Sequence, residues 1–119
     1  MKIAVTSSGQ ALDSPVDPRF GRAAFILIVD ADTMTVEVVD NAENVNAFKG
    51  AGIQAASTIS DKHAEVLLTG FCGPNAFKAL EAAGISVAGE VSGTVREAVA
   101  AFMDGKIKTV SAPNAQGHW

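Results

Sequence analysis

Soft metal ligands are scarce in this sequence of 119 residues, which contains a single cysteine, Cys72, and two histidines, His63 and His118. One cysteine excludes an intramolecular disulfide, and these three side chains cannot complete the four-ligand set of a cysteine–histidine zinc site. The sequence also lacks a Walker A loop, a GxGxxG dinucleotide fingerprint and any pattern typical of a catalytic triad. We therefore expect no enzymatic activity.

Basic residues are outnumbered as well. Nine lysines and arginines stand against thirteen aspartates and glutamates, which gives a formal net charge of −4 and a pI of about 5.0. General nucleic-acid binding needs a basic surface, and the apolar run at Ile3-Ala4-Val5 is too short for a signal peptide or a membrane span. We expect a cytoplasmic protein with neither a nucleic acid nor a membrane as partner.

Hydrophobic residues make up 48% of the sequence, which is enough to bury the core of one domain of this length. No linker, internal repeat or low-complexity run divides the chain. We expect a single domain over residues 1–110, a flexible C-terminal tail over residues 111–119, and a monomer.

Five short β-rich or apolar runs predict strands, and three segments are predicted to form helices. The strands are expected at 2–6, 25–29, 35–39, 65–69 and 85–88, and the helices at 53–61, 75–83 and 95–104. The order β-β-β-α-β-α-β-α, a hairpin followed by strand–helix repeats, predicts an α/β fold with a mixed sheet flanked by helices. Thr94 and Glu97 have the spacing of a capping box, which marks the start of the last helix.

Polar loops follow three of these strands, after Thr6, Thr69 and Ala88. These strands are expected to be parallel, so their carboxyl ends should share one edge of the sheet, where such folds bind ligands. Amides and dipoles at two helix starts would favour an anion at that edge. Taken alone, each of these loops and helix starts has a simpler interpretation as a plain turn or an ordinary helix cap. The candidate residues in these loops are Ser7, Ser8, Gly73, Pro74, Ser92, Gly93 and Thr94.

The long loop over residues 7–23 contains the segment Asp17-Pro18-Arg19-Phe20-Gly21-Arg22. Arg19 and Arg22 carry rigid guanidinium groups that suit multiply charged anions. Gly21 allows a sharp turn or a close approach of the backbone to a ligand. An anion site is one interpretation, and two solvated arginines on a surface loop are the other.

The cysteine and the histidines have their own alternatives. Cys72 lies beside a predicted helix start, where a thiolate can be stabilised. We favour the other interpretation, in which it is a small buried hydrophobic residue. His63 lies near a helix end and is expected to face solvent, and His118 lies in the expected tail.

Four segments of the chain form a recognisable set. They are Arg19-Phe20-Gly21-Arg22-Ala23, Gly73-Pro74-Asn75-Ala76-Phe77 with Ala83-Gly84-Ile85, Gly93-Thr94-Val95 and Gly105-Lys106. Together they resemble the dinitrogenase iron–molybdenum cofactor biosynthesis family, and the resemblance runs from Met1 to about Val110. It implies a ribonuclease-H-like fold with a five-stranded mixed sheet that contains one antiparallel strand.

The family resemblance also implies a function. Members bind metal–sulfur clusters or their precursors and carry them. They usually have a histidine just before the Phe-Gly pair, where this sequence has Arg19. Arginine cannot ligate a metal, but it can pair with an anionic sulfide cluster. Within the family, the resemblance implies an anionic molybdenum–copper sulfide cluster, held without covalent bonds to the chain. Arg19 at the histidine position fits electrostatic capture of such a cluster without a direct metal ligand from the chain.

The implied site combines positive charge, an apolar wall and backbone donors. Its parts are Arg19 and Arg22 for charge, Phe20 and Phe71 with the small residues near them for the wall, and amides near Gly73 and Thr94 as donors to sulfide.

Two other functions stay open at this point. One is a carrier of a nitrogenase iron–molybdenum cofactor or its precursor, with Cys72 or His63 as ligand. The other is a regulatory protein-interaction domain with no bound metal.

Overall fold

The computed structural model describes residues 1–41 and 51–110, which form a five-stranded sheet and three helices. The strands are β1 (Lys2–Ser7), β2 (Phe25–Asp30), β3 (Val36–Asp40), β4 (Val66–Leu68) and β5 (Ser86–Ala88), and the helices are α2 (Ala51–Asp61), α3 (Pro74–Ala82) and α4 (Val95–Met103). The expected α/β class and mixed five-stranded sheet are confirmed. The expected tail at 111–119 lies outside the described residues, as do residues 42–50, between the strand expected at 35–39 and the helix expected at 53–61. No helix in the described ranges has both the length and the apolar character needed to cross a bilayer.

The strands lie in the order β3-β2-β1-β4-β5. β2 runs antiparallel to both of its neighbours, whereas β1, β4 and β5 run parallel to one another. The carboxyl ends of these three parallel strands therefore meet at one edge of the sheet. The loops that begin after Ser7, Leu68 and Ala88 all start at this edge.

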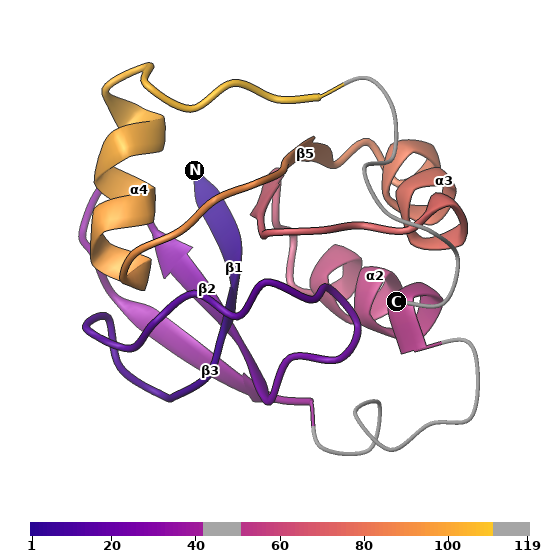
Figure 1. The fold of residues 1–119 in the computed structure, drawn as a ribbon, viewed down its shortest axis with the longest axis horizontal. Helices are drawn as coiled ribbons and strands as arrows, with labels where there is room; N and C mark the ends of the chain where they lie inside the picture. Colours follow the sequence, from indigo (N-terminus) through magenta and orange to yellow (C-terminus); the bar gives the residue numbers. More distant parts are fainter. Residues whose placement is uncertain (42–50, 111–119) are drawn as a thin grey trace.

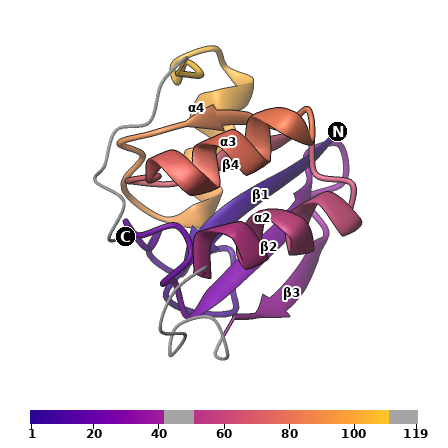
Figure 2. The same cartoon turned by 90° about the vertical axis from the view of Figure 1, so that its right-hand side faces the viewer.

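Helices cover both faces of the sheet, with α2 and α3 on one face and α4 on the other (Figures 1 and 2). The alternation of side chains along β1 divides the core accordingly. Ala4 belongs to the cluster that includes residues of α2 and α3, whereas Ile3 and Val5 belong to the cluster that includes residues of α4. Both faces of the central strand are therefore buried, which explains the nearly continuous apolar sequence of β1 and β2.

The observed boundaries differ from the expected ones mainly at α2. This helix begins at Ala51, two residues before the expected start, so Ala51 and Gly52 are helical and not part of a loop. Gly52 reads as a loop residue in the sequence, but here it permits close packing of two helices. A Cβ atom at Gly52 would lie 2.7 Å from the Cβ atom of Ala76 in α3. Gly52 is thus a helical residue at a close contact between α2 and α3.

The other strand and helix ends either agree with the expected ones or differ by one residue. β4 is shorter than expected, because only Val66–Leu68 pairs on both sides. The flanking residues still bond to neighbouring strands, since the Glu65 amide donates to the Lys2 carbonyl and the Thr69 amide to the Ala88 carbonyl.

The capping box expected at the start of α4 is present. The Thr94 hydroxyl accepts a hydrogen bond from the Glu97 amide at 3.1 Å, and a Glu97 carboxylate oxygen accepts one from the Thr94 amide at 2.9 Å. Hydrogen bonds from the backbone and then the side chain of Thr94 hold the pKa of Glu97 below its usual value of 4.5. Stabilisation from this carboxylate is therefore present above that value and is lost as the pH falls through the depressed pKa.

Replacement of Thr94 by alanine tests this cap. Thr94→Ala leaves the Glu97 amide without its acceptor, and we expect the free energy of unfolding to fall by about 1 kcal/mol. Guanidinium denaturation at neutral pH measures the change. Ser92→Ala is a suitable control, because Ser92 is exposed and precedes the helix, and it should leave stability unchanged. Equal losses in both variants would contradict a capping role.

Candidate functional site

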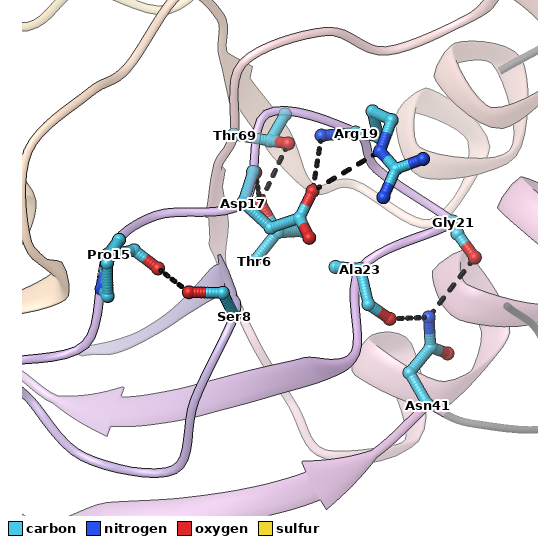
Figure 3. Close-up of polar contacts among 9 residues, drawn as sticks. All are labelled: Thr6, Ser8, Pro15, Asp17, Arg19, Gly21, Ala23, Asn41 and Thr69. Atoms are coloured by element: carbon cyan, nitrogen blue, oxygen red, sulfur yellow. Dashed lines mark hydrogen bonds and ion pairs between the residues drawn. The ribbon is translucent and has the colours of Figure 1, made fainter.

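The long loop after β1 folds back onto the strand that it leaves. The Ser8 amide donates to the Pro15 carbonyl at 3.0 Å, and the Asp17 amide donates to the Thr6 carbonyl at 2.9 Å. Ser7 and Val16 form an isolated antiparallel bridge between these two contacts. The loop is therefore anchored along the end of β1, and Figure 3 shows the arginine segment leaving from that anchor.

A buried hydroxyl pair strengthens the anchor at Asp17. The Thr6 hydroxyl donates to the Asp17 carbonyl at 2.6 Å and shares a hydrogen bond with the Thr69 hydroxyl at 2.9 Å. Both threonines are fully buried. Since Thr6 is the penultimate residue of β1 and Thr69 directly follows β4, the start of the arginine segment is tied to the carboxyl ends of two parallel strands.

The second loop runs beside the first. The Phe71 amide donates to the Pro18 carbonyl at 2.6 Å, and the Phe20 amide donates to the Phe71 carbonyl at 3.1 Å. Gly70 makes this approach possible, because a Cβ atom there would lie 2.6 Å from both the Pro18 Cα atom and the Pro18 carbonyl oxygen. The first and second loops are thus brought together, as the sequence predicted from their common sheet edge.

The far end of the arginine segment is held by Asn41, which is only 3% exposed. Its side-chain amide donates to the carbonyls of Gly21 at 3.1 Å and Ala23 at 2.8 Å, on either side of Arg22. Gly21 has a φ of +95°, and a Cβ atom there would lie 2.8 Å from the Gly52 amide nitrogen. The sequence analysis assigned no role to Asn41, although its position directly after β3 was an available signal.

The two arginines differ in their surroundings. The Arg19 side chain is 49% exposed, and its Nε atom lies 3.7 Å from Oδ1 of Asp17. The same carboxylate oxygen accepts a hydrogen bond from the Arg19 amide at 2.9 Å. Arg22 is half-buried. The segment thus carries two guanidinium groups on a backbone that is fixed at both ends.

The two serines of this loop have structural roles. Ser7 is fully buried, and its hydroxyl donates to the Gly9 carbonyl at 2.8 Å. The exposed Ser8 hydroxyl lies 3.2 Å from the Pro15 carbonyl and can donate to it. Burial of Ser7 differs from its expected place in a ligand-facing group, because its side chain closes a local turn.

The aromatic wall expected from Phe20 and Phe71 is only partly present. Phe20 is 1% exposed and lies in the core cluster beneath α2 and α3, so its ring is not available to a ligand at the surface. The Phe20 ring packs among apolar core residues. The next residue, Gly21, lies directly against the start of α2, which brings this part of the chain close to the core. Phe71 is partly exposed.

Cys72 is a core residue. It is 1% exposed, and burial raises its pKa to about 12, so the side chain is a neutral thiol at physiological pH. His63 is exposed beside Ala64 and Glu65, and the Glu65 amide bonds to Lys2 at the amino end of β1. The structure therefore does not bring His63 to the edge where Arg19 lies. Within residues 1–41 and 51–110, no three His, Cys, Asp or Glu side chains are grouped so that they could hold a metal ion.

The start of α4 is closed to ligands. The Val95 amide donates to the Ser14 carbonyl at 3.0 Å, and the Arg96 amide donates to the Leu12 carbonyl at 2.8 Å. The capping box satisfies the amides of Thr94 and Glu97. The expectation that amides near Thr94 donate to a ligand is therefore not met, because the first loop and the cap use them. Ser92 and Gly93 are exposed in the turn before the helix, and the Gly93 carbonyl accepts from the Val16 amide.

The start of α3 is different. Gly73 is its N-cap residue without a side-chain cap, and Pro74 has no amide hydrogen. The part of the chain that the structure describes supplies no acceptor for the amides of Gly73, Asn75 and Ala76. Helix starts with unsatisfied amides favour anions. This helix follows Phe71, the residue that pairs with Arg19, so the start of α3 and the arginine segment lie at the same edge. Asn75 is exposed there, whereas Gly73 and Ala76 are buried.

Several known proteins are similar to this chain. A family model described as dinitrogenase iron–molybdenum cofactor matches residues 1–105. The structure is similar to the apo form of the orange protein from Desulfovibrio gigas, with a TM-score of 0.93, 50% identity and 96% of each chain covered. It is also similar to a NifB-like protein from Thermotoga, with a TM-score of 0.83, 34% identity and 98% of each chain covered. An uncharacterized protein of Methanocaldococcus jannaschii is 26% identical over 111 residues, which covers 91% of this chain and 90% of the relative.

The buried state of Cys72 can be tested by alkylation. Because burial raises the thiol pKa from 9.0 to about 12, little thiolate is present at pH 8. We expect iodoacetamide to modify the folded protein at least about a hundredfold more slowly than the protein unfolded in guanidinium. Mass spectrometry of timed samples measures both rates. Equal rates would show that Cys72 is accessible and reactive.

Proposed function

Because the chain belongs to the dinitrogenase iron–molybdenum cofactor family, we propose that it binds and carries an anionic metal–sulfur cluster. The match covers residues 1–105, which include the arginine segment and the starts of α3 and α4. The Desulfovibrio gigas relative is described as an apo form, which is a form of a protein without its bound cofactor. The family match and the apo-form relative both support the proposal that this chain carries a bound cargo.

The arrangement of Arg19 and Arg22 is the observation that supports the proposal best. Both lie on a segment whose backbone is held by Asp17 at one end and by Asn41 at the other. The segment lies beside the start of α3, whose first amides have no acceptor within the described ranges. Guanidinium groups and unsatisfied amides are hydrogen-bond donors that suit an anion with its charge spread over several atoms.

The donor set also indicates how the cargo would be held. The neutral thiol of Cys72 faces the core, and the described residues offer no cluster of metal-ligating side chains. Charge pairing and hydrogen bonds to a preformed cluster fit these residues better than direct ligation of metal. Arg19 and Arg22 would neutralise charge, while the amides of α3 would donate to sulfide.

We propose that the cargo is a molybdenum–copper sulfide cluster. Such a cluster exposes sulfide atoms that accept hydrogen bonds, and it needs no ligand from the chain. Arg19, in place of the histidine that the family resemblance leads one to expect, supports this choice over a metal that the protein ligates. The 50% identity to the orange protein, over 96% of both chains, supports a shared class of cargo.

The proposal includes several finer points that remain predictions. Residues 1–110 would form one cluster-binding domain with a ribonuclease-H-like fold. The protein would be a monomer in the cytoplasm, and it would carry its cargo without catalysing a reaction.

A nitrogenase iron–molybdenum cofactor, or a precursor of it, is the second candidate cargo. The description of the matching family and the 34% identity to a NifB-like protein favour it. A carrier of this kind would use Cys72 or His63 as a metal ligand. The burial of Cys72 and the distant position of His63 weigh against this candidate in the described conformation.

Whether Arg19 and Arg22 hold the cluster by charge can be tested by measuring how much cluster each variant retains. The apo-protein is loaded with tetrathiomolybdate and copper, desalted, and assayed by visible absorption and metal analysis. Arg19→Ala and Arg22→Ala each remove a charged donor, so we expect each to weaken binding about tenfold or more. Arg96→Ala is the matched control, because this half-exposed arginine of α4 pairs with Asp13 of the first loop and its loss changes the net charge equally. Retention equal to the wild type in both test variants would rule out electrostatic capture.

Replacement of Cys72 separates the two candidate cargoes. If charge and hydrogen bonds hold the cluster, Cys72→Ser should retain the molybdenum–copper cluster at the wild-type ratio of metal to protein. The same loading and metal analysis measure this ratio, with thermal denaturation to confirm that the variant is folded. Loss of the cluster from a folded Cys72→Ser protein would instead favour ligation through sulfur.

A further inference from the structure

We propose that Asp17 is a positioning residue of the anion site, which fixes both the backbone and the guanidinium of Arg19 so that the terminal nitrogens of Arg19 face the ligand. The proposal rests on the proposed function, because it describes how the arginine segment is prepared for an anion. A carboxylate beside an anion site is unexpected on charge alone, since it repels the ligand. Its presence therefore needs a geometric reason.

The partners of the Asp17 carboxylate supply that reason. The side chain is only 11% exposed, and a carboxylate that is removed from water is costly unless it is paired. In the described ranges, both contacts recorded for its Oδ1 atom are made by Arg19. They are the hydrogen bond from the Arg19 amide at 2.9 Å and the approach of Nε at 3.7 Å. Figure 3 shows both contacts converging on one carboxylate oxygen.

The position of the contact on the Arg19 guanidinium group also matters. Nε is the inner nitrogen of the guanidinium group, and the two terminal nitrogens form the fork that binds oxyanions or sulfides. A contact at Nε therefore restrains the group without occupying the fork. The side chain remains 49% exposed, so the fork is accessible. A long side chain that is already restrained loses less conformational freedom when it binds a ligand.

Asp17 is itself held rigidly, as a positioning residue must be. Its amide and carbonyl are both bonded to Thr6, and Thr6 shares a hydrogen bond with Thr69. Through this connection, the ends of β1 and β4 determine where the carboxylate lies. The Arg19 guanidinium thus takes its position from the sheet, although it projects from a surface loop.

A double-mutant cycle tests the proposal. Absorption titration measures the affinity of the full-length protein for the tetrathiomolybdate dianion in Asp17→Ala, Arg19→Ala and Arg22→Ala, and in the two double variants that contain Asp17→Ala. Asp17→Asn keeps an oxygen acceptor for the Arg19 amide. Asp13→Ala is the matched control, because Asp13 lies in the same loop, is 81% exposed and pairs with Arg96.

We expect Asp17→Ala to weaken binding about tenfold in the wild-type and Arg22→Ala backgrounds. In the Arg19→Ala background it should cause no further loss, because Asp17 acts through that side chain. Asp17→Asn should restore most of the affinity, and Asp13→Ala should not weaken binding. An equal loss in the Arg19→Ala background, or no loss anywhere, would overturn the proposal.

A second measurement keeps this proposal separate from the proposed function. If the wild-type protein does not bind tetrathiomolybdate, the proposed function fails, but the positioning of Arg19 can still be read from ¹H–¹⁵N spectra of the free protein. Asp17→Ala should then shift the backbone amide and Nε resonances of Arg19, and Asp17→Asn should shift the amide resonance much less. Unchanged Arg19 resonances in Asp17→Ala would overturn the positioning role.

Discussion

The candidate site depends on the two hydrogen bonds that join Thr6 to Asp17. The Thr6 carbonyl accepts the Asp17 amide, and the Thr6 hydroxyl donates to the Asp17 carbonyl at 2.6 Å. These groups are buried at the end of a central strand, where a broken hydrogen bond leaves polar atoms without water to replace the partner. The loop that leaves β1 must therefore return to it, and this return places Pro18 against Gly70 and Arg19 beside Phe71.

The starts of α3 and α4 show how the same local signal can have opposite outcomes. Each helix begins after a loop at the same sheet edge, and each has a glycine within the preceding residues. At α4, the first loop supplies carbonyls from Ser14 and Leu12, so the helix start serves to hold that loop in place. At α3, Gly73 offers no side-chain cap, and the amides of Asn75 and Ala76 have no acceptor within the described ranges. One helix start thus stabilises the loop, whereas the other has donors that no acceptor in the described ranges uses.

Close packing of small residues makes the site rigid without adding large side chains to it. Gly21 lies against Gly52, and Gly52 lies against Ala76, so the arginine segment is in direct contact with α2 and, through it, with α3. Phe20 fills the core below this contact. In a chain of net charge −4, the two arginines held on this support are the positive charges on which the proposed capture of an anionic cargo depends.

Hydrophobic patterning, turn residues and cap spacing determined most of the architecture, because these are local signals. They predicted the α/β class, the mixed sheet, the capping box at Thr94 and the gathering of loops at one sheet edge. Only the tertiary structure decided which loop atoms are available at that edge. Burial of Phe20, Ser7 and Cys72, the satisfied amides at α4, and the roles of Asp17 and Asn41 all depend on contacts between residues distant in sequence. Such contacts follow from how strands, loops and helices pack, and a single side chain in the sequence does not reveal which partner it will meet.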